Sequence, residues 1–131
     1  MFLHILNDQQ QKAFLAVATQ FIEADTHLAD AEQNLLELMY AETGLPFETE
    51  LPSGSVGDLL EPFDTKQARA AVLLELIGVG HADDDFHPEE SRFVHDVAER
   101  LGFSDADVHA MEGWIQRQLQ LAKDVEQFWA E

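Results

Sequence analysis

The chain has 131 residues, 46% of them hydrophobic, and carries 26 acidic against 7 basic side chains, a formal net charge of −19. The apolar content is enough for one packed core, while so negative a charge argues against nucleic-acid binding and favours cations or basic protein surfaces. The absence of cysteine excludes disulfides and thiolate sites and agrees with a reducing cytoplasm, where we expect the protein. No run of about 18 apolar residues suits a membrane span, and the first residues, MFLHILNDQQQK, do not resemble a signal peptide.

Apolar residues recur at helical spacing and no stretch alternates with period two, which predicts an all-α fold. Asn7 or Asp8 is expected to cap a first helix that runs to about Ala24. A second helix is expected over about residues 30–43, with Gly44 as its stop. The positions of this second helix predicted to face inward are Leu35, Leu36, Leu38 and Met39.

The second half of the chain begins with a connector rich in Pro, Gly and Ser, residues 45–58, which leads into a short helix near residues 56–60. Asp64 or Thr65 is expected to cap a long helix, and we expect that helix to be central because half of its surface is apolar. Pro88 suits the first position of the next helix. The predicted stop of that helix and the predicted capping pair of the last one are Gly102, Ser104 and Asp107. Together these patterns predict a single all-α domain of about six or seven helices.

The sequence also repeats itself at an offset of 58, in units of about residues 13–46 and 71–104. Each unit reads as an apolar helix, an Ala-Asp pair, an acidic turn, a second helix and a glycine. Asp25 corresponds to Asp83, and Glu32 to Glu90. We therefore expect two helical hairpins packed with approximate two-fold symmetry, which would bring the two acidic turns close together.

The two turns read IEADTHLADAE and GHADDDFHPEE. In this pattern the chain resembles the TerB-like domain of tellurite-resistance TerB proteins, which is similar to the N-terminal part of some membrane-anchored J-domain co-chaperones. The resemblance covers about residues 10–122 and implies an all-helical fold, a role in stress or tellurite resistance and a metal site. The positions that carry over are Asp25, Glu32, Asp83 and Glu90. The family's glycine after the aspartate is replaced by Thr26 and Asp84, and a β-branched threonine resists positive φ, so the first turn is expected to differ.

The densest polar stretch, residues 80–90, has two readings. Ca²⁺ and Mg²⁺ prefer several oxygen ligands, and Asp83, Asp85 and Glu90 offer carboxylates. Their spacing is similar to the second half of an EF-hand loop, but the first ligand positions of such a loop hold no oxygen side chains, so an EF-hand is not supported. In the alternative reading Glu90, at the third position of its helix, satisfies unpaired amides and the helix dipole without any metal. Both readings stay open at this point.

Histidines add a third candidate metal. His81 and His87 flank the acidic residues, and imidazole nitrogen is a ligand for Zn²⁺. The signal for zinc is weak, because no H-x-x-x-H or H-E-x-x-H pair is present. No G-x-S-x-G motif, phosphate-binding glycine loop or dinucleotide fingerprint is present either, so we expect the protein not to be an enzyme.

Large apolar residues stand near both ends, in MFLHIL and in VEQFWAE. They either pack back on the core or form a surface for a homodimer or another protein partner. We expect an acidic binding or regulatory module of the TerB-like type with a divalent metal ion, Ca²⁺, Mg²⁺ or Zn²⁺. The alternative is a structural or interaction domain whose carboxylates cap helices and whose charge recruits a basic partner.

Overall fold

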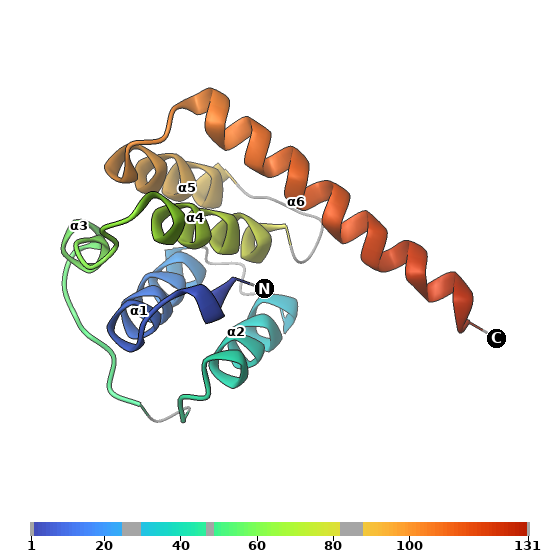
Figure 1. Cartoon of the computed structure of the whole chain (residues 1–131), viewed down its shortest axis with the longest axis horizontal. Helices are drawn as coiled ribbons and strands as arrows, with labels where there is room; N and C mark the ends of the chain where they lie inside the picture. Colours follow the sequence, from blue (N-terminus) through green and yellow to red (C-terminus); the bar gives the residue numbers. More distant parts are fainter. Residues whose placement is uncertain (1, 25–29, 47–48, 82–87, 131) are drawn as a thin grey trace.

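The computed structural model describes residues 2–24, 30–46, 49–81 and 88–130, and throughout these ranges the regular structure is helical (Figure 1). Its elements are the 3₁₀ helix η1 (Leu3–Ile5), α1 (Asp8–Ala24), α2 (Asp30–Thr43), α3 (Val56–Leu60), α4 (Lys66–Gly80), α5 (Pro88–Leu101), α6 (Asp105–Val125) and the 3₁₀ helix η2 (Glu126–Phe128). The predicted single all-α domain is confirmed. Among the described residues, no helix is both long and apolar enough to cross a membrane.

Helix α4 lies at the centre of the molecule, as its apolar sequence predicts. It contacts α1, α2, α5, α6 and η1, and Figure 1 shows it between α5 and the first two helices. Leu73, Leu76 and Ile77 are fully buried in the common core. Since each flanking helix covers part of α4 with its own apolar stripe, the core closes without a sheet.

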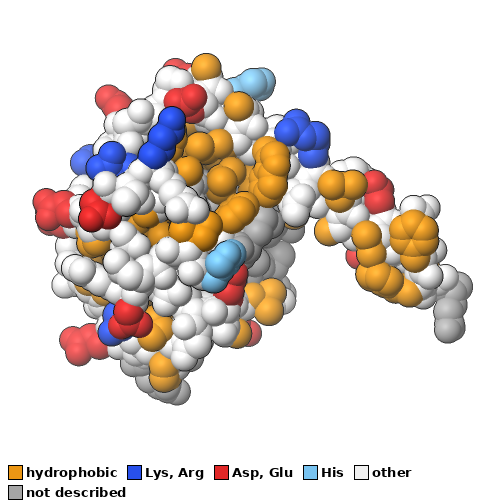
Figure 2. All heavy atoms as spheres, in the orientation of Figure 1, with side chains coloured by type: hydrophobic (Ala, Val, Ile, Leu, Met, Phe, Trp, Pro, Cys, Tyr) orange, Lys and Arg blue, Asp and Glu red, His pale blue; other side chains and the backbone are white. Residues whose placement is uncertain are grey.

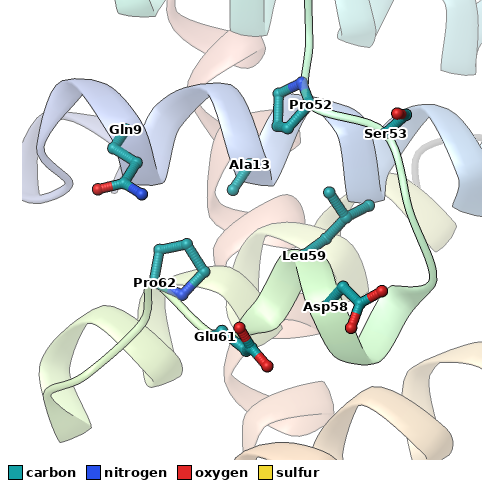
Figure 3. Close-up of a pocket in the computed structure, with 8 residues that line it drawn as sticks. All are labelled: Gln9, Ala13, Pro52, Ser53, Asp58, Leu59, Glu61 and Pro62. Carbon is teal, nitrogen blue, oxygen red and sulfur yellow. The ribbon is translucent and has the colours of Figure 1, made fainter.

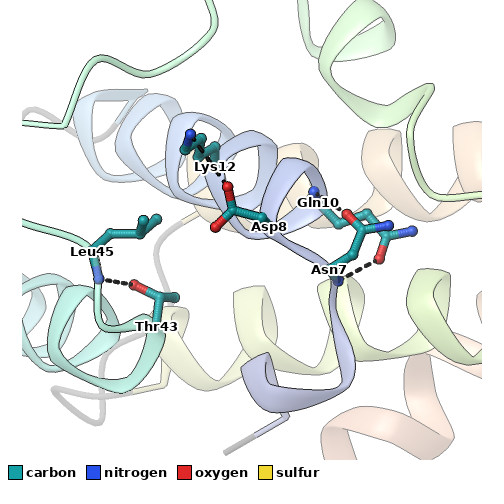
Figure 4. Close-up of polar contacts among 6 residues, drawn as sticks. All are labelled: Asn7, Asp8, Gln10, Lys12, Thr43 and Leu45. Atoms are coloured by element: carbon teal, nitrogen blue, oxygen red, sulfur yellow. Dashed lines mark hydrogen bonds and ion pairs between the residues drawn. The ribbon is translucent and has the colours of Figure 1, made fainter.

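The start of α1 is held by a reciprocal cap (Figure 4). The Gln10 amide donates to Asn7 Oδ1 at 2.8 Å, and the Asn7 amide donates to Gln10 Oε1 at 3.0 Å. Gln10 is buried, and its Nε2 also donates to the Pro62 carbonyl at 3.0 Å, so this side chain ties α1 to the segment after α3. Asn7, one of the two predicted caps, is therefore the residue that caps the helix.

Other helix ends follow the sequence predictions. Thr65 Oγ1 accepts from the Ala68 amide at 3.1 Å at the start of α4. Ser104 and Asp107 form the predicted capping box of α6. Gly44 and Gly102 follow α2 and α5 with φ of 76° and 87°, in the left-handed region that glycine adopts at little cost.

One inward-facing prediction is wrong. Leu36 and Met39 of α2 are buried, but Leu38 is 64% exposed. Each helical residue turns by about 100°, so a face that buries Leu36 and Met39 turns Leu38 towards solvent. The internal repeat stays a prediction, although the ends of α2 (30 and 43) lie 58 residues before those of α5 (88 and 101).

The two apolar ends of the chain have opposite outcomes. Leu3 and Leu6 are buried in the core, so the first end packs back on the body. At the other end Phe128 and Trp129 do not pack on the body, since they are 78% and 68% exposed. Figure 1 shows the second half of α6 projecting beyond the other helices.

Replacing Gln10 by alanine is expected to lower the free energy of unfolding by about 1–3 kcal/mol, because a buried carbonyl and a helix-end amide lose their partners. Gln9, which is exposed on the same turn, is the matched control, and Gln9→Ala is expected to change stability by less than about 0.5 kcal/mol. Urea unfolding followed by circular dichroism measures both. Equal losses in the two variants would contradict the role given to Gln10.

The cap of α6 also makes a pH-dependent contribution. Hydrogen bonds from the backbone and side chain of Ser104 lower the pKa of Asp107 below its ordinary value of 3.8. A pKa that is lower in the folded protein gives stability that is present above about pH 4 and is lost as the pH falls through the folded pKa. In Ser104→Ala the pKa of Asp107 is expected to rise towards the ordinary value, which a carboxyl-carbon NMR titration would measure. An unchanged titration would show that the hydroxyl does not act on this carboxylate.

Candidate functional site

The candidate site lies between the end of α4 and the beginning of α5. α4 ends at Gly80, and the amide of the next residue, His81, donates to the Ile77 carbonyl at 3.1 Å. α5 begins at Pro88, as predicted, and carries Glu89 and Glu90 in its first turn. Three of the predicted ligands, Asp83, Asp85 and His87, lie outside the described residues.

Glu90 occupies the third position of α5 and is completely buried, with 0% of its surface exposed, whereas its neighbour Glu89 is exposed. A carboxylate at such a depth costs several kcal/mol unless hydrogen bonds, an opposite charge or a metal ion compensate it. Glu90 does take part in at least one polar or electrostatic interaction. The positive end of the α5 dipole also favours an anion at this position. Glu90 is therefore an inward-facing charged group, not part of a solvated acidic surface.

The other hairpin contributes less to the described geometry. Asp25 lies outside the described residues, and Glu32 belongs to the first turn of α2, where only its backbone is described. α1 nonetheless packs directly on α5, since the Phe21 and Phe93 rings meet edge to face with centroids 5.3 Å apart. Across residues 2–24, 30–46, 49–81 and 88–130, no group of three His, Asp or Glu side chains is placed to hold a metal ion. The proposed ligand set thus stays a prediction.

His81, which follows α4 directly in the sequence, lies beside α6. It is half-buried and lines a hollow of about 240 Å³ with Gln116, Leu119, Gln120 and Lys123, all from α6. The sequence gives no signal for this contact, because it depends on how α6 crosses the end of α4. His81 therefore connects the acidic turn to α6.

A pocket that the sequence did not predict lies between α1 and the segment around α3 (Figure 3). Its volume is about 410 Å³. Gln9 and Ala13 line it from α1, while the carboxylates of Asp58 and Glu61 lie on the α3 side. Both carboxylates are exposed, so this pocket presents an acidic rim over an apolar floor that includes Leu59.

A second hollow, of about 740 Å³, lies between α5 and the start of α6 and includes Ser91 and His95. His95 Nδ1 is 3.4 Å from Asp105 Oδ1, and both side chains are well exposed. Ser104 also lines this hollow, and its hydroxyl oxygen accepts a hydrogen bond from the Asp107 amide at 3.1 Å. The hydroxyl thus caps α6, and an exposed pair such as His95 and Asp105 adds little to stability.

Fold and site together define, over the described residues, a small all-helical domain with an acid-rich sequence segment between α4 and α5, two helices that pack on each other. Residues 53–113 match the family model described as Tellurite resistance protein TerB, so the resemblance to a TerB-like domain is confirmed over this part of the chain. The matched range runs from the connector before α3 into α6 and includes the second acidic turn, but not the first repeat unit. Comparisons with curated proteins and with solved structures found no match. The likeness to J-domain co-chaperones stays a prediction.

Removing the charge of Glu90 is expected to destabilise the fold even when no metal is present. Glu90→Gln keeps the size of the side chain but removes a buried charge together with its electrostatic interactions in the domain, which is expected to cost about 1–3 kcal/mol. Glu89→Gln removes the same charge one residue earlier at an exposed position and is expected to cost less than about 0.5 kcal/mol. Denaturant unfolding in the presence of a chelator makes the comparison. If the two variants were equally stable, the burial of Glu90 would have no energetic consequence.

Proposed function

We propose that this chain is a non-enzymatic, cytoplasmic binding module of the tellurite-resistance type that responds to a divalent cation. The cation would be held at the turn of residues 82–87, with Glu90 as its innermost ligand. The observation that carries the proposal is the complete burial of Glu90 directly after a segment that reads ADDDFH.

The chemistry of the donors supports a hard cation. Asp83, Asp85 and Glu90 supply carboxylate oxygens, which suit Ca²⁺ and Mg²⁺. Zn²⁺ would need imidazole; His81 lines a hollow with residues of α6, and His87 is the other histidine of this sequence segment. The net charge of −19 would concentrate cations around the molecule, and it would also favour a basic protein as the partner that reads the bound state.

A second candidate function is supported by the position of Glu90 itself. The third residue of a helix is a standard place for a carboxylate that accepts unpaired amides, and this arrangement needs no metal. In that case the domain would be an interaction module whose acidic surface recruits a basic partner, and a role in stress or tellurite response would not depend on cations.

Calorimetric titration of chelator-stripped protein with Ca²⁺, Mg²⁺, Mn²⁺ and Zn²⁺ separates the two functions. Saturable, stoichiometric binding by the wild type and its loss in Asp83→Asn/Glu90→Gln are expected, because the substitutions remove two of the proposed ligands.

The matched control is Asp58→Asn/Glu61→Gln, which removes two exposed carboxylates from the pocket by α3. It makes the protein less negative by the same amount as Asp83→Asn/Glu90→Gln. This control is expected to bind like the wild type. Binding that is weak and non-stoichiometric, or that falls equally in both double variants, would reject the cation site in favour of the interaction module.

A further inference from the structure

The second half of α6 carries an apolar face that the body of the protein does not cover. We call residues 114–130 the α6 arm. Leu121 and Val125 are 59% and 40% exposed, and the aromatic residues at the tip are more exposed still. Figure 2 shows hydrophobic side chains gathered in two areas of one face of the molecule, at the middle of the body and along the projecting end of the arm. Contiguous apolar surface of this kind is typical of an interface.

The charge of the arm differs from that of the rest of the chain. It holds two basic side chains, Arg117 and Lys123, and two acidic ones among its described residues, Asp124 and Glu126. The described arm is thus neutral in a chain whose net charge is −19. Two copies of the body repel each other, so the arm is the surface through which they can approach at little electrostatic cost.

The apolar positions of the arm are symmetric about Leu121. Trp114 lies seven residues, or two α-helical turns, before it. Phe128 lies seven residues after it, in four steps of α6 and one 3₁₀ turn of η2, so the three lie along about the same side. Two arms packed antiparallel, with Leu121 against its own copy, place Trp114 opposite Phe128 at both ends. The overlap runs from residue 114 to residue 128, which is about 21 Å of helix.

The charged side chains agree with this register. Arg117, four residues before Leu121, and Asp124, three residues after it, lie along the same edge of the apolar face. In an antiparallel pair with two-fold symmetry equal edges face each other, so each Arg117 lies beside the Asp124 of the other copy. Gln120 donates to Asp124 at 2.9 Å within the same arm and holds the carboxylate near this edge.

The body offers an apolar surface where the tip of the other arm would arrive. The Trp114 ring lies 5.7 Å from the ring of Phe2. Phe2 in turn lines a hollow of about 240 Å³ with Ile5 and Leu74, whose walls are nearly all apolar. Phe128 of a second copy would thus contact the apolar surface formed by these aromatic and aliphatic side chains.

We propose that the α6 arm is a self-association surface, through which two copies of this chain form an antiparallel, two-fold symmetric dimer centred on Leu121. Sedimentation equilibrium of the full chain in a chelator-containing buffer is the test, so that the result does not depend on a cation site. A mass that rises from monomer to dimer with concentration is expected. Leu121→Gln is expected to weaken the dimer by about tenfold or more, since it puts a polar group at the centre of the interface twice.

Leu38→Gln is the matched control, because Leu38 is an equally exposed leucine on α2, away from the arm. It is expected to leave the dimer unchanged, and circular dichroism confirms that both variants remain folded. Arg117→Glu is expected to weaken the dimer, and Arg117→Glu/Asp124→Arg to restore it. A monomer mass at every concentration, a dimer that survives Leu121→Gln, or a charge reversal that fails to restore association would each overturn the proposal.

Discussion

The burial of α4 is the constraint on which the rest of the structure depends. A helix that is apolar around most of its surface is stable only when several others cover it, and here α1, α2, α5, α6 and η1 do so. This requirement fixes where the ends of the neighbouring helices fall. It places the acid-rich segment between the end of α4 and the start of α5, where Glu90, in the first turn of α5, is buried. The most charged segment of the sequence thus follows directly on the most apolar helix, α4.

Glu90 shows the consequence of that placement. The third position of a helix usually faces water, so the carboxylate of a capping residue keeps part of its hydration. In α5 the residues that follow on the same face, Val94 and Val97, are fully buried, and the helical repeat turns Glu90 inward with them. A negative charge on Glu90 must then be stabilised by interactions within the protein or with a bound ion, because solvent does not reach it. In the proposed cation site the bound ion would supply part of this compensation, whereas in the capping alternative interactions within the domain would supply all of it.

The local features of this fold could be predicted from the sequence, because their causes are local. The caps at Asn7, Thr65 and Ser104 and the glycine stops follow from backbone chemistry within four residues. The contact of His81 with α6, the depth of Glu90 and the pocket beside α3 depend on how distant helices cross, and no local pattern encodes that. The exposure of Leu38 has a related cause, since contacts with distant helices decide which side of α2 faces the core.

The two halves of α6 are stabilised in different ways. The part of α6 up to Leu119 packs on α4 and α5, with Val108 and Ile115 buried, whereas every residue from Leu121 to Ala130 is exposed. A helical segment of this length without packing is marginal in water, because the entropy of ordering it is not offset by buried surface. Its helical form therefore relies on propagation from the packed half, on the Gln120 to Asp124 hydrogen bond and on whatever covers its apolar face. A second arm would bury that face over the turns of α6 that do not pack on the body. Folding of the tip and association would therefore stabilise each other.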